Sequence, residues 1–270
     1  MKLMEVLKRK KVIVLLLNKP NLEALGLKYM ILSLNKMQSC FEFEFPETTG
    51  YPTGYPMEET DYNDPDVPLF NFEKIVKEKD LKGDYFIGVV SGQIGNKWFW
   101  GQKGSFGVVT TVDWKKQFAP PSVLEYVIHC VVSLLMVMSD ETGRIQSHHP
   151  TRGCCLDYTV LKEEDKIDIG LGYICDECKS RIKQNIGEKY LECFEKMHSM
   201  KWLGYVEEKG TVANDLKRYF RIDLNKDTGY SKTRRERMTD GIKDITRQVT
   251  VSVLAASIAL AIGIIIGRIL

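Results

Sequence analysis

A cysteine-rich stretch between residues 148 and 178 constrains this 270-residue chain more than any other part of it. The stretch begins with two adjacent histidines and continues to Cys154 and Cys155. Twenty residues separate Cys154 from a Cys175-x-x-Cys178 turn. A C-x-x-C turn places two thiolates on one side of a tight loop, where both can reach a tetrahedral ion at about 2.3 Å. The sequence therefore predicts a zinc site that joins the two ends of this stretch.

His149 and Cys154 are the predicted partners of the Cys175 and Cys178 pair. The four residues together would fill a tetrahedral shell and leave no open position, which is the pattern of a structural zinc site. Cys155 is a rival for the place given to Cys154, because spacing alone does not distinguish neighbouring cysteines. The alternative is that these cysteines are unrelated, since a free cysteine is often a small buried hydrophobic residue.

The overall composition favours a protein with a buried core in a reducing, cytosolic setting. Apolar residues make up 44% of the chain, and a net charge of +2 argues against general nucleic-acid binding. The seven cysteines are odd in number and clustered, so a disulfide framework is the weaker interpretation. A basic run at residues 8–11 precedes six apolar residues, but no small-residue cleavage site follows. We therefore expect a buried strand there and no signal peptide.

The first part of the chain alternates between strand and helix patterns. Residues 12–17 form an apolar, β-branched run, residues 21–37 suit a helix with a broad buried face, and residues 41–45 alternate strictly. This order of strand, helix and strand predicts a sheet with at least one parallel pair. A long surface loop is expected from 46 to 68, where Gly, Pro, Tyr, Asp and Thr are frequent.

Further strands are predicted after this loop. Residues 70–81 suit a short helix, and strands are expected at 84–91, 98–100 and 106–112 with glycine-containing turns between them. Such turns suit hairpins, so part of the sheet should be antiparallel. The expected fold class is therefore α/β, with a mixed sheet and flanking helices.

A helix that is apolar on almost every side is predicted over residues 123–138. Ser122 and Glu125 form a capping box at its start, and its apolar surface requires a central position in the fold. His129 and the cysteine that follows it are interpreted as packed core residues. Another helix is expected over residues 179–197.

The C-terminal end has the composition of a membrane span. Residues 249–267 contain no charge and would measure about 28 Å as a helix, enough to cross the hydrocarbon core of a bilayer. A buried core helix is the alternative, but it would be expected to show a polar face. Basic residues are frequent in the linker-like segment 226–248, and only residues 268–270 would have to cross. We expect a single-pass, tail-anchored membrane protein with residues 1–225 as a cytoplasmic domain.

Small residues recur at every fourth position of the predicted span. Ala255, Ala259, Gly263 and Gly267 would line one face of a helix, where a second backbone can approach closely. We therefore expect a homo-oligomer that forms through this helix. The alternative is that alanine and glycine are simply common in membrane helices.

The metal-binding stretch resembles the signature of the archaemetzincins, a group of zinc metallopeptidases. Their motif H-E-x-x-H-x-x-G-x-x-H-C-x4-C is followed, about twenty residues later, by C-x-x-C. In that family the three histidines hold a catalytic zinc and the four cysteines a structural one. Here His148 and His149 fall where the third histidine and the first cysteine adjoin, Cys154 falls at the second cysteine, and Cys175 and Cys178 fall at the last pair. The resemblance implies a metzincin-like domain.

The catalytic half of that signature is missing. Counting back from the third histidine at the family's spacing, Met138 and Thr142 stand at the first two zinc-binding histidines, and Ser139 stands at the general-base glutamate. A hydrolytic zinc needs about three protein ligands and a base that activates water. The resemblance, which covers residues 11–200, thus implies a retained structural zinc site, with His149 in place of one cysteine, and a lost peptidase site.

These patterns indicate a tail-anchored membrane protein whose cytoplasmic zinc-binding domain acts in binding or assembly at the membrane, as an effector or a sensor. Such an archaemetzincin-like domain would be a pseudo-peptidase and not an enzyme. One alternative is an active zinc metallopeptidase with a rearranged set such as His129, His148 and Glu141. A thiol redox protein that uses Cys175 and Cys178 is another, although the turn does not have a thioredoxin-like strand-to-helix context.

Overall fold

The computed structural model describes residues 8–17, 21–46, 64, 66–95, 98–149, 151–159, 161–232, 249, 250, 252 and 253. The chain divides into two compact units, Met1–Tyr230 and Ser231–Leu270. Most of the predicted loop 46–68, of the predicted linker 226–248 and of the predicted membrane span 249–267 lies outside the described residues. Within the part that is described, no helix is long and apolar enough to cross a membrane.

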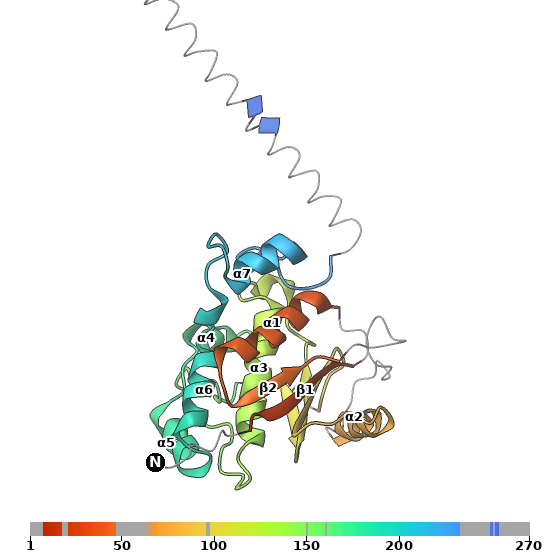
Figure 1. Ribbon diagram of the computed structural model, residues 1–270, viewed down its shortest axis with the longest axis vertical. Helices are drawn as coiled ribbons and strands as arrows, with labels where there is room; N and C mark the ends of the chain where they lie inside the picture. The colour runs from red at the N-terminus through yellow and green to blue at the C-terminus, as the bar shows by residue number, and fades with distance from the viewer. Residues whose placement is uncertain are drawn as a thin grey trace, which may run out of the picture. The chain divides into compact units, whose positions relative to one another are not determined.

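A five-stranded sheet forms the centre of the first unit (Figure 1). Its strands lie in the order β2-β1-β3-β5-β4; the first four are parallel, and β4 pairs with β5 in the antiparallel sense. The predicted α/β class with a mixed sheet is therefore confirmed. The strands are β1 (Lys10–Leu16), β2 (Phe41–Glu44), β3 (Tyr85–Val90), β4 (Trp100–Lys103) and β5 (Phe106–Thr110).

The strand β1 is buried on both faces. Its side chains alternate between two hydrophobic clusters, one on each side of the sheet. A parallel strand that is covered on both faces has a continuous apolar sequence, which is what residues 12–17 show. One cluster receives Val12, Val14 and Leu16, and the other receives Ile13 and Leu15 together with Leu17, the residue that follows the strand.

Helices cover both faces of the sheet (Figure 1). The helices α1 and α3 pack on one face, where α6 joins them, and α2 packs on the other face against β4 and β5. The α-helices are α1 (Ala24–Met37), α2 (Asp66–Glu78), α3 (Val123–Met138), α4 (Asp165–Leu171), α5 (Asp176–Asn185), α6 (Glu188–His198) and α7 (Val212–Asp215). Short turns of other types are η1 (Lys116–Phe118), η2 (Lys201–Leu203) and the π-helical η3 (Leu216–Phe220).

The helix α3 has the central position that its sequence predicts. Each of its 16 residues except Glu125 is buried. The predicted capping box is present, because the backbone N–H of Ser122 donates to the Glu125 carboxylate at 2.7 Å and the Ser122 hydroxyl accepts from the Glu125 N–H. The helix lies very close to β5: a Cβ atom at Gly107 would come within 1.8 Å of Leu134.

Two helices replace the single helix predicted over residues 179–197. The chain breaks between α5 and α6 at Gly187, whose φ of 117° lies outside the helical region. The sequence analysis also missed α4, which has only seven residues and contains a glycine. Its end is marked by Gly172 in the left-handed conformation, with a φ of 54°.

Candidate metal centre

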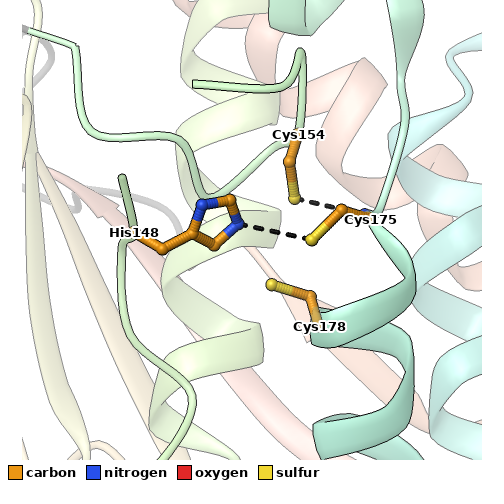
Figure 2. A group of neighbouring side chains, drawn as sticks. All are labelled: His148, Cys154, Cys175 and Cys178. Atoms are coloured by element: carbon orange, nitrogen blue, oxygen red, sulfur yellow. Dashed lines mark hydrogen bonds between the residues drawn. The ribbon is translucent and has the colours of Figure 1, made fainter. Parts of the chain in front are cut away.

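Four side chains converge between the loop that follows α3 and the start of α5 (Figure 2). They belong to His148, Cys154, Cys175 and Cys178, and their possible ligand atoms all lie within 4.8 Å of one another. Cys175 is the N-cap residue of α5, and Cys178 lies in the first turn of that helix. Among the described residues this is the one group of three or more histidine, cysteine, aspartate or glutamate side chains with such spacing.

The dimensions and chemistry of this group fit a tetrahedral zinc ion. With bonds of about 2.3 Å to sulfur and slightly less to nitrogen, the ligand atoms of such an ion lie roughly 3.5–3.8 Å apart. Here Nε2 of His148 lies 3.4 Å from Sγ of Cys175. Three thiolates and one imidazole are a soft donor set that selects zinc over magnesium or calcium. The group therefore supports zinc as the cofactor of this domain.

The ligand atoms are shielded from water. Cys154, Cys175 and Cys178 are 0%, 3% and 1% exposed, and the side chain of His148 is 9% exposed. An ion held by all four atoms would have a complete shell and no open position for water or substrate. The arrangement is suited to a structural metal site, in which the bound ion holds the surrounding chain segments in place.

The histidine in the group is His148, and this corrects the assignment of His149. The backbone of His148 is extended and pairs with the next part of the loop: its N–H donates to Leu156 O at 3.0 Å, and its carbonyl accepts from the N–H of Tyr158 at 3.1 Å. Neighbouring side chains of an extended segment point to opposite sides. His149 therefore faces away from the sulfurs, and its ring packs against Tyr158 with the centroids 4.9 Å apart.

Asp157 lies in the loop that carries His148 and Cys154 (the ligand loop), where it contacts both the loop backbone and the imidazole; the sequence analysis does not identify it. Its side chain is 1% exposed, and Oδ1 lies 3.2 Å from Nδ1 of His148. The other oxygen, Oδ2, accepts the backbone N–H groups of Arg152 and Cys154. Zinc-binding histidines usually donate their second ring nitrogen to such a carboxylate, which fixes the tautomer and leaves the other nitrogen for the metal. In this structure the Asp157–His148 contact has the distance of an ion pair without hydrogen-bond alignment, and it leaves Nε2 of His148 facing the Cys175 sulfur.

The electrostatics of the three thiols also favour a cation. Hydrogen bonds from the Cys155 thiol, the Cys178 thiol and backbone N–H groups lower the pKa of Cys154, whose sulfur accepts from the Cys175 N–H at 3.3 Å. The hydrogen bond with Cys154 and burial together raise the pKa of Cys178. Thiols this close cannot all ionise alone, and a divalent ion removes that repulsion.

Cys155, the rival of Cys154 in the sequence analysis, is not one of the four residues in the group. Its N–H donates to Tyr173 O at 2.9 Å, and its carbonyl accepts from the Ser133 hydroxyl of α3 at 3.0 Å. Burial raises the pKa of its thiol. Cys155 thus anchors the ligand loop to the central helix.

The rearranged catalytic set of His129, His148 and Glu141 does not form a metal-binding group within the described structure. His129 lies in the core, where its ring meets that of His198 with the centroids 5.2 Å apart. Burial lowers the pKa of both imidazoles, to about 4 for His129. Glu141 is exposed to solvent. The prediction that His129 is a packed core residue agrees with this position.

The Cys175-x-x-Cys178 turn also lacks a thioredoxin-like setting. The residue Tyr173, shortly before the turn, forms a single bridge to Cys154 and is not part of a strand. Both sulfurs of the turn lie within the group of four ligands (Figure 2). The turn therefore has the environment of a metal-binding knuckle.

The fold and the site together define an α/β domain with a closed metal centre of three cysteines and one histidine. No protein-family model matches the sequence. No curated protein matches it either. The structure is similar to the crystal structure of an archaemetzincin from Methanopyrus kandleri, with a TM-score of 0.43, 13% sequence identity, and coverage of 70% of this chain and 100% of the other. At this level of similarity, no activity is transferred from that protein to this chain.

Proposed function

We propose that this chain is a non-catalytic, zinc-stabilised domain that a C-terminal segment holds at a membrane, where it acts in binding or assembly. The observation that carries the proposal is the closed group of His148, Cys154, Cys175 and Cys178. A zinc ion in this group would connect the loop after α3 to the start of α5. Because such a site does not exist in the unfolded chain, its binding energy is also folding energy, on the order of 10 kcal/mol.

The residues at the lost catalytic positions support the absence of peptidase activity. Met138 is 7% exposed and belongs to the hydrophobic core. The Ser139 hydroxyl donates to Leu135 O at 2.7 Å, and Thr142 donates its hydroxyl and its N–H to the Asp140 carboxylate. These side chains thus build the end of α3 and the turn after it, and they do not supply ligands or a general base.

The membrane part of the proposal is supported by the sequence. The uncharged residues 249–267 are long enough to span a bilayer, and the basic residues before them favour a cytoplasmic position for the N-terminal domain. The small residues from Ala255 to Gly267 supply a face for association of two such helices. A zinc-stabilised domain brought together in this way would act as an assembly module.

Elemental analysis of the full-length protein tests the metal. We expect one zinc per chain in the wild-type protein and none in Cys178→Ser, which loses one of the four ligands. Cys130→Ser is the matched control, because Cys130 is a buried cysteine of α3 outside the group, and it should keep its zinc. Wild-type protein without zinc would refute the proposal.

Two further assays test the remaining parts. Full-length protein should stay in the membrane pellet after a high-salt wash, whereas a chain that ends before Val249 should be released; a truncated chain that stays in the pellet would refute the anchor. Zinc-loaded protein should cleave no peptide substrate in a chelator-sensitive manner. Hydrolysis that disappears on His148→Ala would favour the alternative, an active zinc metallopeptidase.

A further inference from the structure

A second cysteine pair lies outside the metal centre. Cys40 and Cys193 are separated by 153 positions in the sequence, yet their Sγ atoms are 2.6 Å apart. Atoms of this size that are only in contact stay about 3.5–4 Å apart, and a disulfide bond measures about 2.05 Å. Both residues are free cysteines, with 5% and 3% exposure. The two sulfurs are therefore held much closer than ordinary packing requires.

Each cysteine of this pair lies in a well-packed element, Cys40 next to the strand β2 and Cys193 in the helix α6. Cys40 directly precedes the edge strand β2, and the side chain of Gln38 accepts the backbone N–H groups of Cys40 and Phe41, each at 2.7 Å. Cys193 lies in the middle of α6. On either side of it, Tyr190 and Phe194 pack against the Phe41 ring, with centroids 5.6 and 5.5 Å apart. The approach of the two sulfurs is thus set by a strand edge and a helix that pack tightly together.

The two thiols have different chemical characters. The hydrogen bond between the two thiols, with further bonds from the Ser39 and Cys40 N–H groups, lowers the pKa of Cys193. The same hydrogen bond, with burial, raises the pKa of Cys40. The Cys40 thiol also lies within donor distance of the Lys189 carbonyl, at 3.4 Å. Cys193 is thus the thiol of the pair that more readily forms a nucleophilic thiolate, and Cys40 is a neighbouring thiol that can resolve an oxidised partner.

We propose that Cys40 and Cys193 are a redox pair that hydrogen peroxide converts to an intramolecular disulfide between the edge of the sheet and α6. The Cys193 thiolate attacks one peroxide oxygen and displaces hydroxide, which leaves a sulfenic acid on Cys193. The Cys40 sulfur then attacks the Cys193 sulfur, so that the S–S bond forms and a second hydroxide leaves. The two thiol protons convert both hydroxides to water. Two thiols thereby lose two electrons, and the peroxide gains them.

The burial of the pair explains why peroxide suits it. The two residues are only 3–5% exposed, so a molecule close in size to water can reach the pair more easily than a bulky disulfide can. The new bond would fix α6 to β2, and α6 packs against α5, the helix that carries Cys178. Oxidation would therefore make the half of the domain that holds the metal more rigid without using any metal ligand.

Peptide mapping of the full-length, zinc-loaded protein tests this pair. The protein is treated with micromolar hydrogen peroxide, alkylated with N-ethylmaleimide, and digested with trypsin without reduction. Cys40 is the one cysteine of tryptic peptide 37–74, and Cys193 is the one cysteine of peptide 190–196. We expect these peptides as a single linked species, lighter than their sum by two hydrogen atoms. The cysteines of the metal centre lie in two other peptides, 153–162 and 167–179, and report separately on that centre.

Thermal unfolding provides the second readout and the controls. Because the bond closes a loop of about 150 residues, oxidised wild-type protein should unfold at a temperature roughly 5 °C or more above the reduced protein, and dithiothreitol should reverse this shift. Cys193→Ser should show neither the shift nor the linked peptide, whereas Cys130→Ser should show both. The proposal fails if peptides 37–74 and 190–196 are recovered separately and alkylated at a peroxide dose that already oxidises peptide 167–179.

Discussion

Replacing Asp157 with asparagine removes the carboxylate of the metal centre with almost no change in shape. In the wild-type protein one oxygen of Asp157 faces His148 Nδ1, and the other accepts the N–H groups of Arg152 and Cys154. Asparagine has one acceptor oxygen. If that oxygen keeps the backbone bonds, the amide NH₂ faces the imidazole N–H, and two donors oppose each other.

The expected loss of zinc affinity follows from the number of acceptor oxygens that asparagine offers. Asp157 Oδ1 approaches His148 Nδ1 at 3.2 Å as a charge contact without hydrogen-bond alignment. Losing this contact and opposing two donors should together cost about 1.5–3 kcal/mol, where each 1.4 kcal/mol corresponds to a tenfold change in affinity. We therefore expect Asp157→Asn to bind zinc about 10- to 100-fold more weakly than wild type, in agreement with the usual effect of losing such a carboxylate. Competition with a chromophoric chelator at pH 7.5 measures this ratio directly.

Asp176→Asn is the matched control for this experiment. Asp176 is an exposed carboxylate between the two cysteines of the turn, and it is not one of the residues of the group. Its variant should bind zinc within about threefold of wild type, since a screened surface charge contributes little. If Asp157→Asn also stays within threefold while circular dichroism shows an intact fold, the reasoning that makes Asp157 the positioning residue is refuted.

Three further predictions concern the core and the tail. Burial lowers the pKa of His129 to about 4 and also lowers that of His198, so the unfolded state binds more protons than the folded state below pH about 6.5. The free energy of unfolding should therefore have its full value above pH about 6.5 and should fall towards pH 4 by about 1.4 kcal/mol per pH unit for each histidine. Urea unfolding at pH 7.5 and 5.0 should show a smaller drop in this free energy for His129→Leu than for wild type. Gly107→Ala should lower the free energy of unfolding in urea by roughly 1–3 kcal/mol, because the new Cβ would collide with Leu134 of α3. Gly170→Ala has open space around its Cβ and should leave the free energy of unfolding unchanged or raise it slightly. Gly263→Leu should weaken cross-linked oligomers in membranes without releasing the protein; an unchanged oligomer ladder would contradict the small-residue face.

The sheet and the central helix are predictable because their signals are local and strong. The continuous apolar run of β1 reflects burial on both faces, and the capping box at Ser122 marks the first residue of α3. The boundary between α5 and α6 is less visible, because Gly187 interrupts a sequence that otherwise suits one helix. The short helix α4 contains too few apolar residues to produce a helical period.

The cysteines of the metal centre are predictable from the sequence, whereas the choice of its histidine is not. The prediction names Cys154, Cys175 and Cys178, because C-x-x-C spacing and clustering are properties of the sequence alone. The choice between His148 and His149 depends on which side of an extended segment faces the sulfurs. That side is set by the pairing of His148 with Asp157, a contact across the loop that has no periodic signature. The pairs His129–His198 and Cys40–Cys193 are missed for the same reason, since each joins distant helices or strands.

The metal centre lies in a part of the domain with little regular secondary structure. Between the end of α3 and the start of α5, the described residues of 139–175 contain one helix, α4, of seven residues. A helix of that length is not stable alone, because nucleation costs more than so few hydrogen bonds return. Both ends of this segment carry ligands, His148 and Cys154 on one side and the Cys175 turn on the other. The segment shares one hydrophobic core with α3 through Ile145, Leu156 and Ile169. A bound zinc would close the segment against α3 and α5, and it would add the stability that local helix propensity lacks.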